Sequence, residues 1–404
     1  MDDRSILRKL ATQYMEIATE PGQNLKRQLW RELNSLRAKR PAIYVRAFAW
    51  HEMPDSKCHC CDPFFRGIES HFRNEIFRSG FGDDYIIEPW LKIPAVHLCY
   101  GWGVAGERHF AEGETKGSYK EDYPLKNLSD ITHLRPPVHS IDEEATRQNH
   151  ESLKSAIGDI IPIEIDRGPA YRMWTGDIST ELGHLRGIEN FMLDMMDSPD
   201  ELHALLAFMR DGIFTTHAQA EAAGDWGLIC HENQAMPYSM ELNDPVPGKT
   251  GIQRKELWCF MASQEYTCVS PEMFDEFLLQ YQLPILAKFG LTAYGCCEDL
   301  TRKISLLKKI PNLRRIAVSP FAKLESCVAQ AGQDYVLSYR PSPADMVSYG
   351  FDESRIRKIL RRDFAICRDS YFDVTLKDVE TVQNDPERIR KWVRVVRDEL
   401  ESSL

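Results

Sequence analysis

Apolar positions follow two different periods along this chain. Residues 3–20 and 24–39 carry apolar side chains at helical spacing on either side of Pro21-Gly22, which predicts two amphipathic helices. From residue 226 onward, short apolar runs alternate with helical patterns. The predicted strands are 226–232, 257–263, 291–297, 314–319, 335–339 and 372–376. The predicted helices between and after them are 299–309, 320–331, 351–367 and 386–402.

This strand–helix rhythm is typical of a parallel sheet with crossover helices, and so many units predict closure into a TIM (β/α)8 barrel. Earlier strands are predicted at 41–50, 85–100, 158–166 and 171–174, and helices at 64–78, 142–157, 183–195 and 199–223. We therefore expect an N-terminal helical extension, 1–40, and one barrel domain, 41–404. A glycine- and charge-rich segment of about 101–137 shows no sustained period and is predicted to be a functional loop or lid.

Charge and cysteine content narrow the class of protein. The 404 residues carry a net charge of −11, which disfavours a nucleic-acid partner. No apolar run approaches the roughly 20 residues that span a membrane, and the N-terminus lacks a secretory apolar region. Eleven cysteines, an odd number in a Lys- and Glu-rich chain, favour reduced thiols and a cytoplasmic location.

The stretch from Leu291 to Glu298 combines a predicted buried strand with two thiols and a carboxylate at its C-terminal end. Strand alternation predicts Tyr294, Cys296 and Glu298 on one face and Cys297 on the other. Thiolate and carboxylate at this spacing could hold zinc, whereas small buried hydrophobic cysteines are the alternative interpretation. A second cysteine-rich string, 58–61, lacks a partner pair at zinc-finger distance and is interpreted as a loop entering a helix.

Polar side chains recur at the predicted C-terminal ends of successive strands. They are His231, Glu232, Gln264, Glu265, Cys296, Cys297, Glu298, Arg340, Lys377 and Asp378. In a barrel those ends converge on one mouth, so these residues are predicted to share a pocket. Each also has an ordinary structural interpretation, such as a core histidine at 231 or a helix-capping carboxylate at 265. Dinucleotide, Walker, nucleophile-elbow and zinc-protease motifs are absent from the sequence.

Several of these motifs resemble those of a known superfamily. The matching strings are Ser263-Gln264-Glu265, Val269-Ser270-Pro271-Glu272-Met273-Phe274, Tyr294-Gly295-Cys296-Cys297-Glu298, Ser338-Tyr339-Arg340-Pro341 and Leu376-Lys377-Asp378-Val379-Glu380-Thr381-Val382. They resemble the uroporphyrinogen decarboxylase-like superfamily, and within it the corrinoid-linked methyltransferases (trimethylamine corrinoid protein 2-like or methylcobamide methyltransferase-like). The resemblance runs from about residue 42 onward and is most specific between 257 and 386.

The resemblance implies a zinc-dependent methyltransferase that moves a methyl group between a small O-, N- or S-methyl compound and a corrinoid (cobalamin) protein. It implies a metal site of Cys296, Glu298, His231 and Asp378, with Cys297 as an alternative ligand. The family's usual histidine corresponds to Tyr294, and its later cysteine corresponds to Asp378. A separate corrinoid protein is expected because no Asp-x-His-x-x-Gly-like motif occurs in the chain.

Further roles follow from the same resemblance. Tyr294, Glu265 and Arg340 are the candidate catalytic residues, and Gln264, Glu232 and Lys377 are the candidate substrate-binding residues. A homodimer is also implied, with the apolar faces of the N-terminal helices as the candidate contact. Two alternatives remain at this point: a metal-free lyase of the decarboxylase type that acts on a small carboxylate, and a non-catalytic barrel that binds a corrinoid or a partner.

Overall fold

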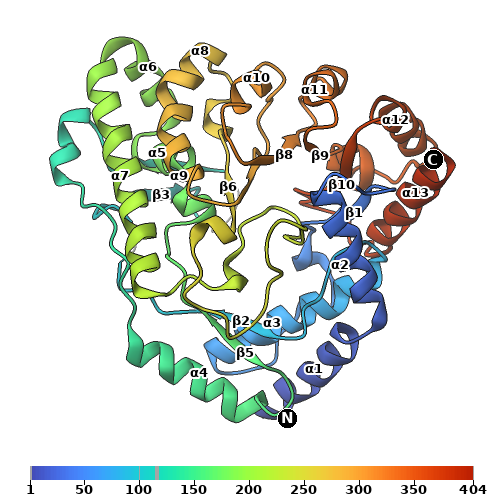
Figure 1. Ribbon diagram of the computed structural model, residues 1–404. Helices are drawn as coiled ribbons and strands as arrows, with labels where there is room; N and C mark the ends of the chain where they lie inside the picture. The colour runs from blue at the N-terminus through green and yellow to red at the C-terminus, as the bar shows by residue number, and fades with distance from the viewer. Residues whose placement is uncertain (1, 100, 114–117, 404) are drawn as a thin grey trace.

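The computed structural model describes residues 2–99, 101–113 and 118–403. Its centre is a six-stranded parallel sheet with the order β1-β10-β9-β8-β7-β6 (Figure 1). The strands are β1 (Ala42–Val45), β6 (Trp258–Met261), β7 (Leu291–Tyr294), β8 (Leu313–Val318), β9 (Val336–Tyr339) and β10 (Tyr371–Leu376). β2 (Leu91–Pro94) and β5 (Ile163–Asp166) form a separate parallel pair, and β3 (Glu107–Phe110) and β4 (Tyr119–Asp122) an antiparallel one.

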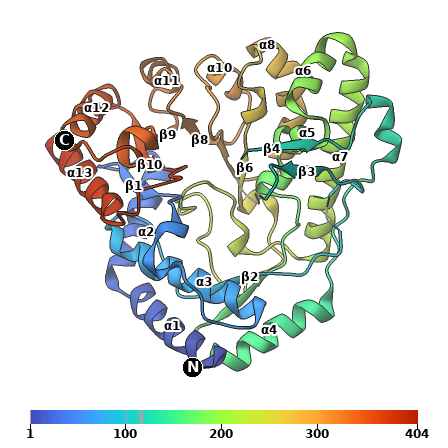
Figure 2. The same cartoon turned by 180° about the vertical axis from the view of Figure 1, so that it is seen from behind.

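Helices surround these strands on the outside. They are α1 (Asp3–Ala18), α2 (Pro21–Asn34), α3 (Pro63–Arg78), α4 (Glu143–Ile157), α5 (Ile178–Arg186), α6 (Ile188–Asp197), α7 (Pro199–Ala223), α8 (Pro271–Phe274), α9 (Gln280–Leu286), α10 (Ile304–Leu307), α11 (Leu324–Ala331), α12 (Glu353–Ile366) and α13 (Glu387–Ser403). Helices α8, α10 and α11 lie outside β6–β8, whereas α1 and α4 lie at the opposite end of the molecule, near β2 and β5 (Figures 1 and 2).

The predicted α/β class and the parallel sheet are confirmed, but two expected strands are not present. The segment 226–232 contains a 3₁₀ turn, Leu228–Cys230, because the Cys230 sulfur accepts the Gly227 amide and bends the chain. The segment 171–174 leads into another 3₁₀ turn, Met173–Gly176. Within the described residues the six-stranded sheet and the β2–β5 pair are separate ladders, so the closure of the predicted barrel remains a prediction.

Other predicted elements differ mainly in their bounds. The expected helix 183–195 is divided into α5 and α6 at Gly187, whose positive φ of 83° ends α5. The expected strand 85–100 is reduced to β2, and the expected helix 299–309 to α10. The glycine-rich segment 101–137, part of which lies outside the described residues, contains the β3–β4 hairpin and a 3₁₀ turn, Leu128–His133. Its role as a lid stays a prediction.

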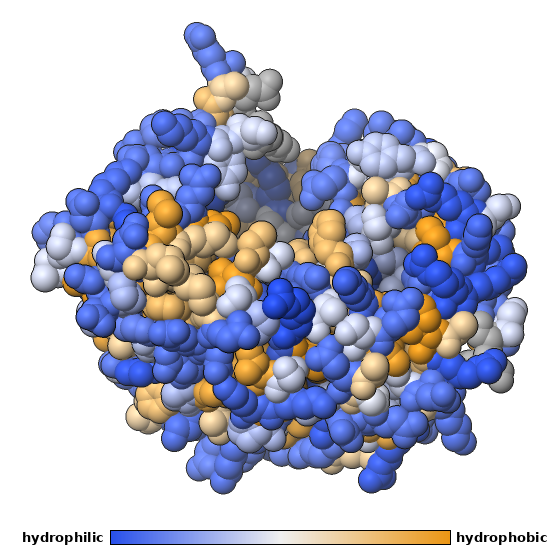
Figure 3. Space-filling model, turned by 90° about the horizontal axis from the view of Figure 1, so that it is seen from above, coloured by the Kyte–Doolittle hydropathy of each residue, from blue (hydrophilic) through white to orange (hydrophobic). Residues whose placement is uncertain are grey.

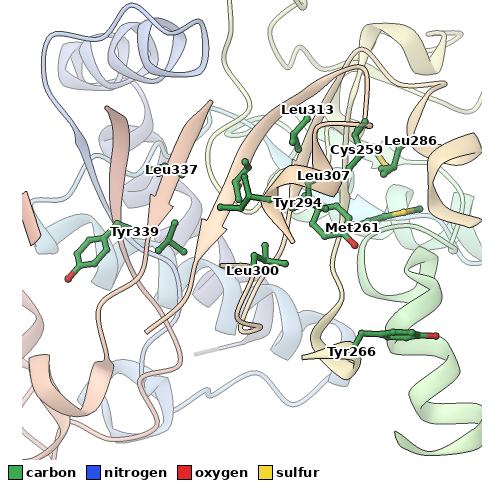
Figure 4. Packing of buried hydrophobic residues seen from close by; sticks show 14 of the residues in the cluster. Cys259, Met261, Tyr266, Leu286, Tyr294, Leu300, Leu307, Leu313, Leu337 and Tyr339 are labelled. Atoms are coloured by element: carbon green, nitrogen blue, oxygen red, sulfur yellow. The ribbon is translucent and has the colours of Figure 1, made fainter. Parts of the chain in front are cut away.

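The sheet separates two hydrophobic clusters. The larger one fills the space between the strands and the outer helices, and Tyr294 lies there among Met261, Leu300 and Leu307 (Figure 4). The smaller one lies at β6 and β7 and includes Phe260, Ala293 and Cys296, together with Trp174. The two faces of β7 therefore pack against different hydrophobic clusters. The residues that follow β7 place Cys296 in the smaller cluster.

The outer surface is mainly hydrophilic on the face that Figure 3 shows, with hydrophobic side chains gathered in small patches. Exposed hydrophobic residues occur on α6, where Leu193 and Met196 are 62% and 72% exposed. α1 and α2 bury much of their apolar faces within the chain, for example Leu7 of α1 and Trp30 of α2. The suggested homodimer contact through these two helices stays a prediction.

Candidate functional site

The C-terminal ends of neighbouring strands bring charged and sulfur-containing side chains together, as parallel strands do at one edge of a sheet. The residues that follow β6, β7, β9 and β10 in this way are Ser263, Cys296, Arg340 and Lys377. All four are buried, at 5% exposure or less. The strand order β10-β9-β8-β7-β6 explains why residues more than 110 positions apart in the sequence meet here.

A turn at Gly295 decides which way the cysteines face. β7 ends at Tyr294, and Gly295 has a φ of +94°, a conformation that glycine adopts without strain. A Cβ atom at this position would lie 2.5 Å from Leu300 Cδ1. The turn interrupts the alternation of the strand, so the prediction that Tyr294 and Cys296 share a face is wrong. Tyr294 lies in the outer core, and Cys296 joins Phe260 on the other side of the sheet.

The Tyr294 hydroxyl is used inside the protein. The side chain is 1% exposed, and its Oη donates to Gln282 Oε1 at 2.7 Å. Gln282 in turn donates to Asp177 Oδ1 at 2.9 Å. Tyr294 therefore lies on the other side of the sheet from Cys296. A chain of buried hydrogen bonds connects its hydroxyl to Gln282 and Asp177.

Glu298 holds the turn in place. Its carboxylate accepts hydrogen bonds from the Ser263 amide at 2.7 Å and from the Cys296 amide at 2.7 Å. The Ser263 hydroxyl donates to the same carboxylate at 3.1 Å. Burial raises the pKa of Glu298 although these donors favour its charge. Both oxygens of this predicted metal ligand are thus engaged in joining the ends of β6 and β7.

Lys377 is at the centre of the cluster formed by Cys296, Cys297, Lys377 and Asp378, here called the thiol–lysine cluster. Lys377 Nζ donates to Cys296 Sγ at 2.9 Å and to Cys297 Sγ at 2.8 Å. It also lies 2.9 Å from Asp378 Oδ2. The two sulfur atoms are 3.6 Å apart, and Cys297 Sγ is 3.6 Å from Asp378 Oδ2. Asp378 is exposed and Cys297 half-buried, so the cluster is reached from solvent on that side.

The two cysteines differ in ionisation. The hydrogen bond from Cys297, together with the positive charges of Arg340 and Lys377, lowers the pKa of Cys296 to about 4 against the opposing effect of burial. The pKa of Cys297 is raised, because its thiol donates to Cys296 and is partly desolvated. Burial disfavours the charge of Lys377, but the Cys296 sulfur outweighs it and raises the lysine pKa. At neutral pH the cluster therefore pairs a Cys296 thiolate with a Lys377 ammonium.

Arg340 links the cluster to the segment after the 3₁₀ turn Leu228–Cys230. Its Nη1 donates to the Cys296 carbonyl at 2.7 Å, and its Nη2 to Gln234 Oε1 at 2.8 Å. Its buried Nε has no hydrogen-bond partner within the described residues. Arg340 also lines a cavity of about 610 Å³ between the ends of β8 and β9 and helices α11 and α12. Gln234 was not among the predicted site residues.

The other predicted ligand, His231, is engaged elsewhere. Its Nε2 is 3.0 Å from the Asn243 carbonyl, and its Nδ1 accepts the Trp258 amide at 3.2 Å. Burial lowers its pKa to about 4, so the ring is neutral. The described residues contain no group of three or more His, Cys, Asp or Glu side chains arranged to hold a metal ion. The structure therefore gathers Cys296, Cys297 and Asp378 but leaves His231 and Glu298 in backbone contacts.

A second group of polar residues, here called the carboxylate cluster, comprises Lys92, Asp166, Arg172, Cys230 and Glu232. Arg172 donates to Asp166 and lies 3.3 Å from Glu232 Oε1, and Lys92 Nζ lies 3.3 Å from Asp166 Oδ2. Cys230 Sγ donates to Asp166 Oδ1 at 3.2 Å. Burial raises the pKa of Glu232 to about 7 despite Arg172 and Lys92. The predicted substrate-binding residue Glu232 thus belongs to this cluster.

Glu265 and Gln264 form the 3₁₀ turn after β6, Gln264–Tyr266. Glu265 Oε2 accepts the Ser179 hydroxyl at 2.5 Å, so the carboxylate meets the first turn of α5. Asp177 lies beside them, fully buried, and burial together with Glu265 and Glu298 raises its pKa well above the ordinary value. Sequence reasoning missed Asp177, which precedes α5 and accepts a hydrogen bond from Gln282; the single signal in the sequence was a carboxylate between Gly176 and Ile178.

Comparisons with known proteins add information on the fold. No protein-family model matches the chain, and no curated protein matches it. Among solved structures, a methyltransferase from Methanosarcina mazei is similar, with a TM-score of 0.50 and 12% sequence identity, over 92% of this chain and 97% of that one. At this identity the likeness concerns the fold. Within the described residues, no helix is both long and apolar enough to cross a membrane.

Proposed function

We propose that this protein is a methyltransferase component that moves a methyl group between a small O-, N- or S-methyl compound and a corrinoid protein. The observation that carries the proposal is the Cys296 thiolate held beside Lys377 and Arg340 at the C-terminal edge of the sheet. Sites at this edge are the usual ones in parallel α/β enzymes. The fold likeness to a protein named a methyltransferase supports the same class of reaction.

The residues do not fit the zinc site that the resemblance implied. Two of its four ligands, His231 and Glu298, have their donor atoms in hydrogen bonds to backbone groups. The remaining donors, Cys296 and Asp378 with the alternative Cys297, already surround an ammonium group. The side chains themselves are therefore the groups available for the chemistry.

Methyl transfer from a heteroatom to a corrinoid needs a group that stabilises the departing heteroatom. The bond between the methyl carbon and the heteroatom breaks with both electrons on the heteroatom, while the electron pair of the reduced corrinoid forms the new bond to carbon. The Lys377 ammonium supplies positive charge that stabilises the departing heteroatom, and Arg340 supplies a second positive charge nearby. Asp378 is the exposed partner of Lys377 and so the one that a substrate can replace.

The test is a methyl-transfer assay with methylcobalamin and a panel of small thiols, amines and phenols. We expect turnover by the wild-type protein and a loss of at least about 100-fold in Lys377→Met, since removal of one charge-stabilising group typically costs that much. Cys61→Ser, an exposed cysteine in the loop before α3, is the control and should retain activity. No turnover with any substrate would overturn the proposal.

A second candidate function is a lyase that acts on a small carboxylate. The observation in its favour is Arg340, whose buried Nε lacks a partner and which borders the cavity of about 610 Å³. A guanidinium with a free donor is suited to a carboxylate. Release of carbon dioxide from small carboxylates, without any dependence on a cobamide, would favour this candidate. A protein that shows neither reaction but retains a cobamide would favour the non-catalytic binding hypothesis.

A further inference from the structure

We infer that the Lys377 ammonium is the resident cation of the thiol–lysine cluster and is held by Cys296, Cys297 and Asp378 in place of a metal ion. The inference concerns a positioning role for one residue, and it rests on contacts rather than on the proposed reaction. It also explains why a chain with a family-like cysteine lacks the remaining family ligands.

The number and kind of contacts support it. An ammonium group has three N–H donors and no acceptor. Lys377 Nζ has three partners, Cys296 Sγ at 2.9 Å, Cys297 Sγ at 2.8 Å and Asp378 Oδ2 at 2.9 Å. Each donor can therefore have its own acceptor, at hydrogen-bond length. Zinc would need these same atoms about 2.3 Å from sulfur and about 2.0–2.2 Å from oxygen.

The lysine is also held in place. Its side chain is 5% exposed, and it follows β10, which pairs with β9 and β1 on either side. The Cys296 backbone is fixed from two directions, by Glu298 at its amide and by Arg340 at its carbonyl. Neither the thiolate nor the ammonium can move away without breaking buried hydrogen bonds, which makes displacement by a metal ion costly.

This arrangement predicts that the protein gains metal binding when Lys377 is replaced by a shorter, uncharged side chain. Lys377→Met would leave two sulfur donors and one carboxylate around a vacated position. Three protein ligands with one open position is the ligand count of catalytic zinc sites. The variant should therefore bind metal that the wild-type protein does not hold.

The experiment measures zinc and cobalt binding to protein washed with chelator. We expect less than about a tenth of a zinc ion per wild-type chain and about one per chain of Lys377→Met, with thiolate-to-cobalt charge-transfer absorption in the variant. Lys377→Met combined with Cys296→Ala should lose this binding. Lys303→Met is the control, because Lys303 is a buried lysine whose ammonium donates to the Tyr266 carbonyl and does not belong to the thiol–lysine cluster.

A wild-type measurement keeps the inference testable if Lys377→Met does not fold. The rate at which iodoacetamide modifies Cys296 and Cys297 in wild-type protein should be the same with and without EDTA, and added zinc should not slow it. One zinc per wild-type chain, lost in Cys296→Ala, would overturn the inference, as would protection of both thiols by zinc.

The outcome is separable from that of the proposed function. Methyl transfer that persists in EDTA supports both the proposed methyltransferase function and the inferred role of Lys377. Methyl transfer that EDTA abolishes and zinc restores would contradict the role of Lys377 while leaving the methyltransferase in place. Absence of methyl transfer, together with zinc binding only in Lys377→Met, would contradict the proposed function and leave the inference standing.

Discussion

Two cysteines of this protein are both buried beside charged side chains, but their pKa values are shifted in opposite directions. Cys296 and Cys230 are 3% and 1% exposed, and each contacts a charged side chain. Cys296 accepts from the Lys377 ammonium, whereas Cys230 donates to the Asp166 carboxylate. Burial and Asp166 raise the pKa of Cys230 to about 12, while Cys297, Arg340 and Lys377 lower that of Cys296 to about 4. Because both thiols are buried, the hydrogen bond from Cys297 and the neighbouring charges are what distinguish the reactive thiol from the inert one.

The cations around the two cysteines serve different partners. In the carboxylate cluster, Arg172 and Lys92 form ion pairs with Asp166 and Glu232, and the charge of Arg172 only partly offsets the effects of burial and Asp166 on Cys230. In the thiol–lysine cluster, two of the three Lys377 contacts are with sulfur. We therefore expect the carboxylate cluster to contribute to stability and the thiol–lysine cluster to reactivity, and the following changes test that division.

The largest effect is expected from Arg172→Met. The substitution leaves Asp166 and Glu232 buried without their main cation, and breaking a buried ion pair in this way costs about 3–5 kcal/mol. Urea unfolding followed by circular dichroism measures the change, with Lys377→Met as the comparison. We expect Lys377→Met to cost less, because Cys296 can take up a proton when the lysine is absent. Equal losses of unfolding free energy in the two variants would contradict the assignment of stability to the carboxylate cluster and reactivity to the thiol–lysine cluster.

The second effect is a difference in alkylation rate. At pH 7, Cys296 should react with iodoacetamide at least about 100-fold faster than Cys230, since Cys297, Arg340 and Lys377 lower the pKa of Cys296 whereas burial and Asp166 raise that of Cys230. Peptide mapping by mass spectrometry reads both sites in one sample, and their similar burial makes them matched controls. Lys377→Met should reduce the ratio of the alkylation rate of Cys296 to that of Cys230, and Lys377→Arg should preserve most of this ratio.

The smallest effect is a pH dependence of stability that comes from Glu232. Its folded-state pKa of about 7 lies above the ordinary 4.5, so the native state favours the protonated acid. The associated stability is present below pH 4.5 and is lost as the pH rises through about 7, a change of about 3 kcal/mol. Glu232→Gln should flatten the stability profile over that interval. An unchanged slope in the variant would assign the pH dependence to another group.

Sequence patterns predicted more of the fold than of the site's geometry. Period and length predicted β6–β10 and α7 closely, because the strands are buried apolar runs and α7 is a 25-residue helix that begins at Pro199 and ends before Gly224. The convergence of strand ends predicted that residues such as Cys296, Lys377 and Asp378 meet. The turn at Gly295 was not foreseen, since strand alternation takes no account of a positive φ, and its effect was to reverse the face of Cys296. Apart from the Cys296 amide, the backbone groups that His231 and Glu298 contact lie 12 to 35 residues away, which local patterns do not encode.

Glu298 also couples the motions of two strand ends. One buried carboxylate accepts the amides of both Ser263 and Cys296, which belong to the segments after β6 and β7. Neither amide can reach solvent unless the carboxylate releases it, so both should exchange their hydrogen for deuterium in a single cooperative opening event. The edge of the sheet that carries the thiolate is therefore expected to open as a unit, and its opening rate sets how often Cys296 samples a different orientation.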